Sequence, residues 1–146
     1  MNIRLMTIDD YDEVYRLWSA TPGMGLNDVD DSRGGTARYL ARNPHTCFVA
    51  EQDGTIAGAI MSGHDGRRGM IHHTVVAESG QRKGIGTALV NAALAALRSE
   101  GISKVMLVVF ARNEKGNAFW EKQGFSARTD LVYRNKALRE LVRFDT

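Results

Sequence analysis

The residues best placed to do chemistry are seven consecutive ones at the start of a strongly helical stretch. They are Gln81, Arg82, Lys83, Gly84, Ile85, Gly86 and Thr87. A helix start leaves its first backbone N–H groups unpaired and carries a partial positive charge. Because glycine has no Cβ, Gly84 and Gly86 let a ligand approach these amides, and the two neighbouring cations add charge. The run therefore predicts an anion site, most naturally for phosphate, with a flexible helix cap that binds no ligand as the alternative.

Neither of two familiar phosphate-binding motifs fits this run. A P-loop requires Lys and then Ser or Thr directly after its last glycine, but Gly86 is followed by Thr87 and Ala88. A dinucleotide-binding fingerprint that starts at Gly84 requires glycine or alanine five residues later, where the chain has Leu89. The expected phosphate site is therefore of another kind.

The elements that must position this run follow from the hydrophobic pattern. Alternation of apolar and polar residues predicts strands, and repeats at helical spacing predict helices. The predicted strands are 2–7, 46–52, 55–63, 70–76, 104–110 and closing strands within 125–138, and the predicted helices are about 8–20, with Thr7 as N-cap, 31–42, 84–99 and 114–123. Asp53 and Gly54 between two strands are a strong hairpin signal. The nearly all-apolar stretch 104–110 indicates a strand covered on both faces.

This order of elements indicates an α/β fold with one mixed, mostly antiparallel sheet and helices on both faces. The chain has 146 residues, of which 43% are hydrophobic, and we expect one domain over 1–146. A net charge of +2 argues against nucleic-acid binding. The single Cys47, the lack of a long apolar run and the lack of a signal peptide predict a cytoplasmic protein outside the membrane. No spacing typical of a metal site is present.

A resemblance to a known family gives this phosphate site a ligand. Residues 81–86 match the Q/R-x-x-G-x-G/A signature of the GNAT superfamily of acetyl-coenzyme A-dependent N-acetyltransferases. The stretch "NEKGNAFWEKQGF" at 113–125 is similar to the family's N-x-x-A-x-x-F/L-Y-E-x-x-G-F segment, and the order of elements agrees to about residue 138. The resemblance implies a splayed strand pair that holds acetyl-coenzyme A (acetyl-CoA), the cosubstrate.

The resemblance also implies which residues hold acetyl-CoA. By position, Val75 and Val76 line the gap between the splayed strands, where backbone groups pair with the pantetheine arm. The amides of about Arg82 to Thr87, following Gln81, hold the pyrophosphate. Asn113 matches an asparagine that hydrogen-bonds near the pantetheine, although an N-cap for a helix starting at Glu114 is the alternative for this residue.

The catalytic groups are less well marked. His72 and His73 lie on the strand before the glycine turn, and alternation predicts that they point to opposite faces. In relatives whose base lies on this strand, its position favours His72 as the base or as the residue that holds a water. Many relatives carry a tyrosine acid where this chain has Trp120. Tyr133 or a water is then the candidate proton donor, unless the thiolate leaves unprotonated.

The predicted function is acetyl transfer to a primary amine of a small molecule or a protein by direct attack in a ternary complex. Burial of Cys47 in a strand disfavours an acetyl-cysteine route. A non-catalytic acyl-CoA-binding sensor is the alternative, and protein N-terminal acetylation is a weaker one. The carboxylates of Asp28, Asp30 and Asp31 could attract an ammonium group or belong to a solvated loop that caps a helix. The acceptor, and whether the chain is a monomer or a homodimer, stay open.

Overall fold

The computed structural model describes residues 1–144, so the last two residues of the predicted 1–146 domain lie outside it. The strands are β1 (Asn2–Leu5), β2 (Leu26–Asn27), β3 (Phe48–Gln52), β4 (Thr55–His64), β5 (Gly69–Val76), β6 (Val105–Met106) and β7 (Arg143–Phe144). The helices are α1 (Tyr11–Ala20), α2 (Arg33–Arg42), α3 (Ile85–Ser99) and α4 (Glu114–Lys122), with short 3-10 turns η1 (Ile8–Asp10) and η2 (Glu78–Gly80). Within the described residues, none of these helices is long and apolar enough to cross a bilayer.

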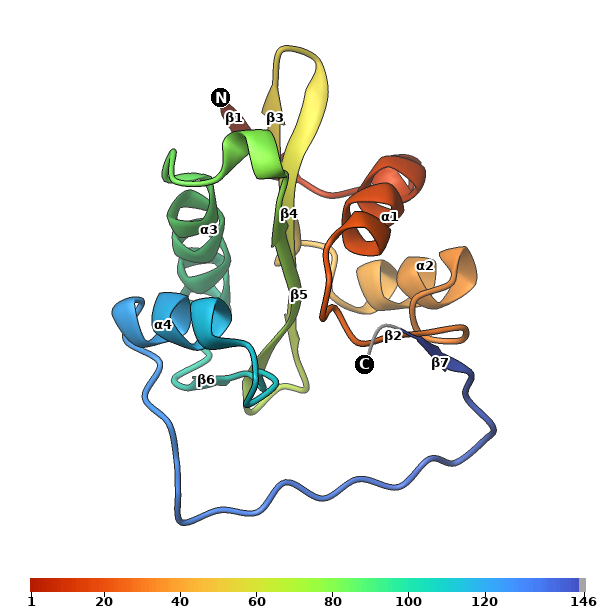
Figure 1. Ribbon diagram of the computed structural model, residues 1–146, viewed down its shortest axis with the longest axis vertical. Coiled ribbons are helices and arrows are strands. Elements are labelled where there is room, and N and C mark those ends of the chain that lie inside the picture. Colours follow the sequence, from red (N-terminus) through yellow and green to blue (C-terminus); the bar gives the residue numbers. More distant parts are fainter. Residues whose placement is uncertain (145–146) are drawn as a thin grey trace.

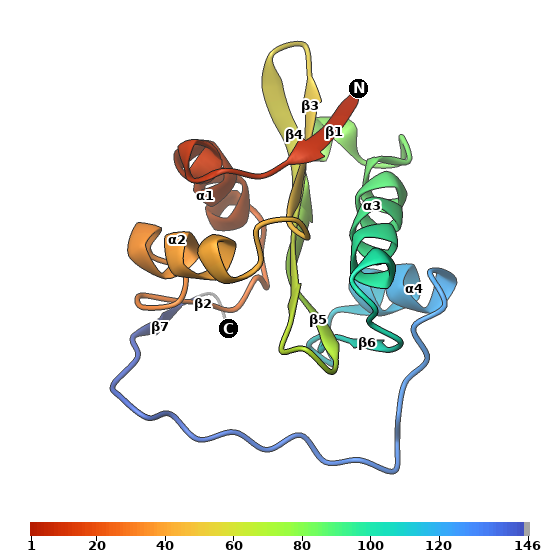
Figure 2. The ribbon, with the colours of Figure 1, turned by 180° about the vertical axis from the view of Figure 1, so that it is seen from behind.

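The main sheet lies between two layers of helices. Its strand order is β1-β3-β4-β5-β6, and every pair is antiparallel except β5 with β6. The helices α1 and α2 cover one face, and α3 and α4 cover the other (Figures 1 and 2). The predicted mixed, mostly antiparallel sheet with helices on both faces is therefore confirmed. A separate two-stranded pair joins β2 to β7.

The hairpin between β3 and β4 forms where the sequence predicts it. Asp53 and Gly54 have φ angles of 53° and 77°, so both turn residues are left-handed. Two such residues are what a type I′ turn requires, and this turn matches the twist of the flanking strands.

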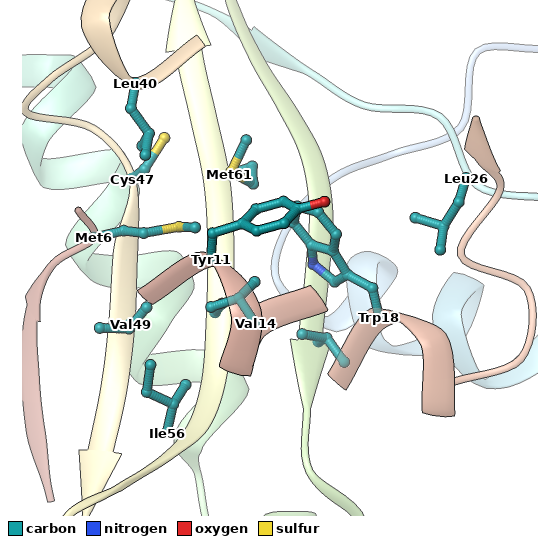
Figure 3. Close-up of a cluster of buried hydrophobic side chains, with 12 residues drawn as sticks. Met6, Tyr11, Val14, Trp18, Leu26, Leu40, Cys47, Val49, Ile56 and Met61 are labelled. Carbon is teal, nitrogen blue, oxygen red and sulfur yellow. The ribbon is translucent and has the colours of Figure 1, made fainter. Parts of the chain in front are cut away.

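Apolar side chains on both faces of the sheet fix the layers. On the α1 and α2 face, Trp18 and Val14 are fully buried, and they point from α1 toward the strands (Figure 3). On the other face, α3 contributes the buried stripe Ile85, Leu89, Val90, Ala93 and Leu97. This stripe repeats at helical spacing, as predicted, and holds the start of α3 against the sheet.

The predicted buried strand at 104–110 is wrong in length and in burial. Only Val105 and Met106 are in strand conformation, and the exposed fractions of Met106 and Val108 are 48% and 56%. Val105 and Leu107 pack on the α3 side, so exposure alternates along the stretch. An all-apolar pattern is compatible with a strand that is buried on both faces. Among the described residues, however, the face that carries Met106 and Val108 is not covered.

The closing strands predicted within 125–138 are also absent. Helix α4 ends at Lys122, Gly124 two residues later has a φ of 92°, and Phe125 N donates to Trp120 O at 3.0 Å. Residues 126–142, here called the arm, then run as an extended segment away from the sheet to β7 (Figures 1 and 2). The alternating pattern suits a strand, but strand formation depends on a neighbouring strand that local sequence does not specify.

Candidate functional site

The glycine turn leaves a row of backbone amides free. Gly84 is the N-cap of α3 with a φ of 79°, and Arg82 is also left-handed with a φ of 65°. Ala88 N donates to Gly84 O at 3.0 Å, whereas the amides of 82–87 have no backbone acceptor in the described part of the chain. Alternation of left- and right-handed residues curves successive amides into an anion-binding concavity. The turn therefore has the geometry that the sequence predicts for an anion site.

The two glycines of the turn differ in their surroundings. A Cβ added at Gly84 would meet nothing within 4 Å, whereas one at Gly86 would lie 3.2 Å from the Phe119 ring. Gly86 therefore lets α4 pack against the start of α3, and the space on its Cβ side is taken by Phe119. Only Gly84 opens onto free space.

The side chains of the predicted run divide between solvent and core. Gln81, Arg82 and Lys83 are exposed, and the exposed fraction of Ile85 is 2%. Thr87 Oγ1 accepts from Gln123 Nε2 at 3.0 Å. The Arg82 and Lys83 side chains therefore place positive charge next to the free amides. The buried Ile85 side chain fixes the turn against the core.

Strands β5 and β6 splay apart beside this turn. Within residues 1–144 they pair at Gly69 with Val105 and at Met70 with Met106 alone, so the rest of β5 has an open edge there. Ala77 N donates to Ala57 O at 2.8 Å, so residue 77 is hydrogen-bonded to the neighbouring strand β4. Because hydrogen-bonded and non-hydrogen-bonded residues alternate along an antiparallel strand, the backbone N–H and C=O groups of Val75 also point toward β4. The backbone N–H and C=O groups of Thr74 and Val76 face the open edge instead. Of the two predicted valines, only Val76 presents backbone groups to the gap.

Thr74 is a candidate ligand contact that the sequence reasoning missed. Its Oγ1 is buried and has no hydrogen-bond partner among the described residues. A buried hydroxyl without a partner costs free energy unless a ligand or water satisfies it. The only sequence signal for Thr74 is its spacing of two from Val76 on the same strand.

A β-bulge places both histidines on one face of the sheet. In the pairing of β4 with β5, Ile60 lies opposite Thr74 and Ser62 lies opposite Ile71. One residue of β4 therefore lies between these two pairs, but two residues of β5 do. His72 and His73 therefore both stand opposite Met61, whose side chain lies in the core on the α1 and α2 face. The predicted opposite orientation of the two imidazoles is wrong, because an extra residue in one strand interrupts alternation.

The two imidazoles have different environments on that face. The His73 ring lies 4.9 Å from the Trp18 ring, and the His72 ring lies 5.3 Å from the Tyr39 ring. His73 Nε2 lies 2.7 Å from Asp31 Oδ1, and both side chains are mostly buried. His72 is exposed. His73 is therefore held in place by the core, whereas His72 is open to a second molecule.

Asp31 is an anchor rather than part of a solvated loop. Its Oδ2 accepts from Asn27 N at 2.8 Å, and its backbone O accepts from the Tyr11 hydroxyl at 2.6 Å. The N-cap of α2 is Ser32, whose side chain accepts from Gly35 N at 3.0 Å. No local signal links residue 31 to residue 73, so the sequence could not predict their contact.

The pKa of His72 is lowered from its ordinary value of 6.5. Desolvation by the surrounding protein is the main cause, and the neighbouring His73 adds to it, while more distant carboxylates oppose it. The imidazole of His72 is therefore neutral near pH 7 and able to accept a proton. The His72 residue nevertheless keeps solvent-accessible surface, so a ligand can reach it.

Asn113 occupies the N-cap of α4, which is the alternative that the sequence left open. Its Oδ1 accepts from Gly116 N at 2.9 Å. Trp120 packs edge-on between Phe119, at 5.0 Å, and Phe125, at 5.3 Å between ring centroids. All three rings pack against the core cluster that α3 forms with the sheet. Tyr133 lies on the arm with 66% of its surface exposed and is not brought to the glycine turn or to His72.

Cys47 is shielded from solvent, and we expect it to be dispensable. Its exposed fraction is 1%, its thiol donates to Ser62 O at 3.2 Å, and burial raises its pKa to about 12. The Cys47→Ala variant should keep the protein's activity within about threefold while losing about 1–2 kcal/mol of stability. A thiol-reactive dye should label Cys47 of the wild-type protein only on unfolding. Rapid labelling of the folded protein with loss of activity would contradict this expectation.

Two shallow hollows lie on the described surface. One, of about 270 Å³, adjoins the glycine turn at Lys83 and is bordered by the β3–β4 hairpin. The other, of about 240 Å³, lies on the α1 side and is lined by Asp31, Tyr11 and Tyr15 among others. No group of three or more His, Cys, Asp or Glu side chains that could hold a metal ion occurs in residues 1–144.

Comparisons with known proteins relate the chain to one family. The model of the acetyltransferase (GNAT) family matches residues 11–125. An acetyltransferase of Sodalis glossinidius is 30% identical over 140 residues, which is 96% of this chain and 97% of that relative.

Solved structures share the fold. Ard1 from Thermoplasma volcanium superposes with a TM-score of 0.76 at 24% identity, over 86% of this chain and 82% of that one. A Mycobacterium tuberculosis protein crystallised with CoA superposes with a TM-score of 0.68 at 20% identity, over 86% and 72% of the two chains. At such identities the likeness concerns the arrangement of the elements.

Proposed function

The chain belongs to the acetyltransferase (GNAT) family, and we propose that it acetylates a primary amine of a small molecule or a protein. It is therefore a transferase, and the family uses acetyl-CoA as the acetyl donor. We further propose that residues 1–146 form one domain and that the amine attacks the donor directly in a ternary complex. The donor supplies the acetyl group as an activated thioester.

The observation that carries the proposal is the row of free amides at the start of α3. The amides of 82–87 lack backbone acceptors in the described residues, and Gly84 leaves open space beside them. A pyrophosphate has the negative charge and the acceptor oxygens that such a turn favours. Arg82 and Lys83 add charge, and Gln81 begins the turn. The residues present therefore fit the phosphate end of CoA.

The open edge of β5 suits the pantetheine arm. Backbone N–H and C=O groups of Thr74 and Val76 face this edge, and an amide-containing chain can pair with them as an added strand does. The buried Thr74 hydroxyl lacks a partner within residues 1–144 and could bond to the same ligand. The Val75 side chain, which is 3% exposed, stabilises this part of β5 through the core. Asn113 stabilises the start of α4 as its N-cap.

His72 is proposed as the base. An amine must lose its proton before it attacks a carbonyl carbon, so the reaction needs a neutral acceptor of suitable pKa. The lowered pKa of His72 leaves its imidazole neutral at pH 7, and its exposure on the α1 and α2 face lets an amine or a bridging water reach it. The amine acceptor is accordingly proposed to approach from this face.

Among the described residues, 1–144, no side chain is placed as an evident proton donor for the departing thiolate. The Trp120 indole is packed between two phenylalanine rings and does not release a proton at physiological pH. Tyr133 remains a predicted acid, but its position on the arm leaves it outside the gap. We propose that water serves or that the thiolate leaves unprotonated.

A pair of measurements tests the function. Release of free CoA is followed over a panel of small amines and peptides, including peptides with free N-termini, and acetyl-CoA binding is measured by calorimetry. We expect both binding and turnover with at least one class of amine. Tight binding without turnover on any amine or peptide would instead support the sensor alternative, and no binding at millimolar acetyl-CoA would refute the site.

A further inference from the structure

Strand β6 and the residues after it present apolar side chains on one face of the sheet. Val105 and Leu107 pack against the core on the α3 side, so Met106 and Val108 project from the opposite face, where α1 and α2 lie (Figures 1 and 2). The exposed fractions of Met106 and Val108 are 48% and 56%. Neighbouring apolar side chains that stay half exposed mark a surface that can bind an apolar group.

Phe110 extends this apolar surface toward the loop that follows α1. It is next in the alternation after Val108, and a Cβ added at Gly25 would lie 3.2 Å from its ring. The guanidinium carbon of Arg112 lies 4.4 Å from the centre of the same ring. Contacts with both residues therefore hold the Phe110 ring in place. The side chains of Met106, Val108 and Phe110 are here called the β6 strip.

The β6 strip shares its face with His72. Met70 and Met106 are in register in the parallel pair of β5 with β6, so their side chains point to the same side of the sheet. Two residues further along the two strands are His72 and Val108. Because the strands splay there, Val108 stands across the gap from His72. An amine whose nitrogen reaches the His72 imidazole therefore has the β6 strip beside its carbon chain.

The carboxylates near this face are engaged within the chain. The partners are the His73 ring for Asp31, the Val142 amide for Asp28 and the Asn27 side-chain amide for Asp30. These contacts fix the loop between α1 and α2 rather than leave an acidic surface for a second positive charge of the substrate. The face therefore favours an amine whose remaining atoms are apolar.

We propose that the β6 strip binds the carbon chain of the amine substrate, so that the enzyme selects a small alkylamine over an equally long polycationic amine. From Met106 to Phe110 the strip is about 13 Å long at roughly 3.3 Å per residue, which suits a short carbon chain. This inference rests on the proposed function and adds the substrate class to it. The residues that determine the specificity are Met106, Val108 and Phe110.

A matched pair of amines gives the first test. n-Hexylamine and cadaverine are equally long, but cadaverine ends in an ammonium group where n-hexylamine ends in a methyl group. We expect kcat/KM to be at least about tenfold higher for n-hexylamine, because the strip desolvates the methyl end at no cost in charge burial. In the series from propylamine to hexylamine, kcat/KM should rise about threefold to fourfold with each added CH2 group.

Substitution of Val108 gives the second test. Val108→Asp should lower kcat/KM for n-hexylamine at least about tenfold without lowering it for cadaverine. Leu5→Asp is the matched control and should keep the preference, since Leu5 is 39% exposed on β1 at the opposite edge of the sheet. Val108→Thr keeps the shape of the side chain and should weaken the preference by about threefold, even if the aspartate variant does not fold. Calorimetry should give the same CoA affinity for each folded variant.

The outcomes separate this inference from the proposed function. If the wild-type protein turns over cadaverine as fast as n-hexylamine, or if Val108→Thr and folded Val108→Asp keep the full preference, the inference is overturned and the proposed function stands. Turnover of no amine or peptide in the panel would overturn the proposed function, and the inference with it.

Discussion

The Gly84→Val variant is expected to lower the affinity for acetyl-CoA, and kcat/KM with it, by at least about 100-fold. The physical reason is local, because a branched side chain at this position would stand over the free amides where the phosphates are proposed to bind. Loss of several charge-assisted hydrogen bonds of about 1.5–3 kcal/mol each accounts for an effect of this size. Calorimetry with CoA and steady-state kinetics measure it.

Gly101→Val is the matched control for backbone strain. Gly101 follows the other end of α3, has a φ of 86° and, like Gly84, would place a Cβ in open space. Both variants should lose stability, by at least about 1–2 kcal/mol, because left-handed residues disfavour Cβ atoms. Only Gly84→Val should lose CoA affinity. Equal losses of affinity in both variants would attribute the effect to folding, and unchanged affinity in Gly84→Val would remove the proposed phosphate site.

The second large effect is expected at His72. His72→Ala should lower kcat by about 10²–10⁴-fold, the usual contribution of a positioned acid or base, with little change in CoA affinity. His45→Ala is the control, since His45 is also exposed but lies in the loop before β3. If His72→Ala retains wild-type kcat on an accepted amine, His72 is not the base.

The pH dependence gives the same assignment a separate readout. Desolvation lowers the pKa of His72 below 6.5, so the imidazole gains its proton only in more acidic solution. The value of kcat/KM should therefore fall on acidification below pH 6.5 and change little from this group above pH 7. In His72→Ala that inflection should disappear. An inflection that persists there and vanishes in His73→Gln would assign the base to the histidine paired with Asp31.

Local sequence was sufficient for the elements whose form depends on their own residues. Asp53 and Gly54 adopt the left-handed turn that their types favour. The apolar stripe of α3 and the glycine before it predict both the helix and its free amides, so the phosphate site could be proposed before any coordinates. The fold class followed from the order of these elements.

What the sequence could not predict depends on contacts between distant residues. His73 and Asp31 are 42 residues apart, and nothing near either residue indicates the other. The occupation of space beside Gly86 by Phe119 depends on how α4 docks. The arm and β6 both have strand-like sequences, but pattern alone does not decide which edge a strand joins.

The extra residue in β5 also bears on how this chain can diverge. In a regular strand, insertion or deletion of one residue moves every later side chain to the opposite face of the sheet and disrupts the core. Where two residues of β5 already share one position opposite β4, removal of one restores ordinary alternation and leaves Val75 and Ile71 on their present faces. The number of imidazoles on the α1 and α2 face can therefore change by loss of one residue without altering the packing on either face of the sheet.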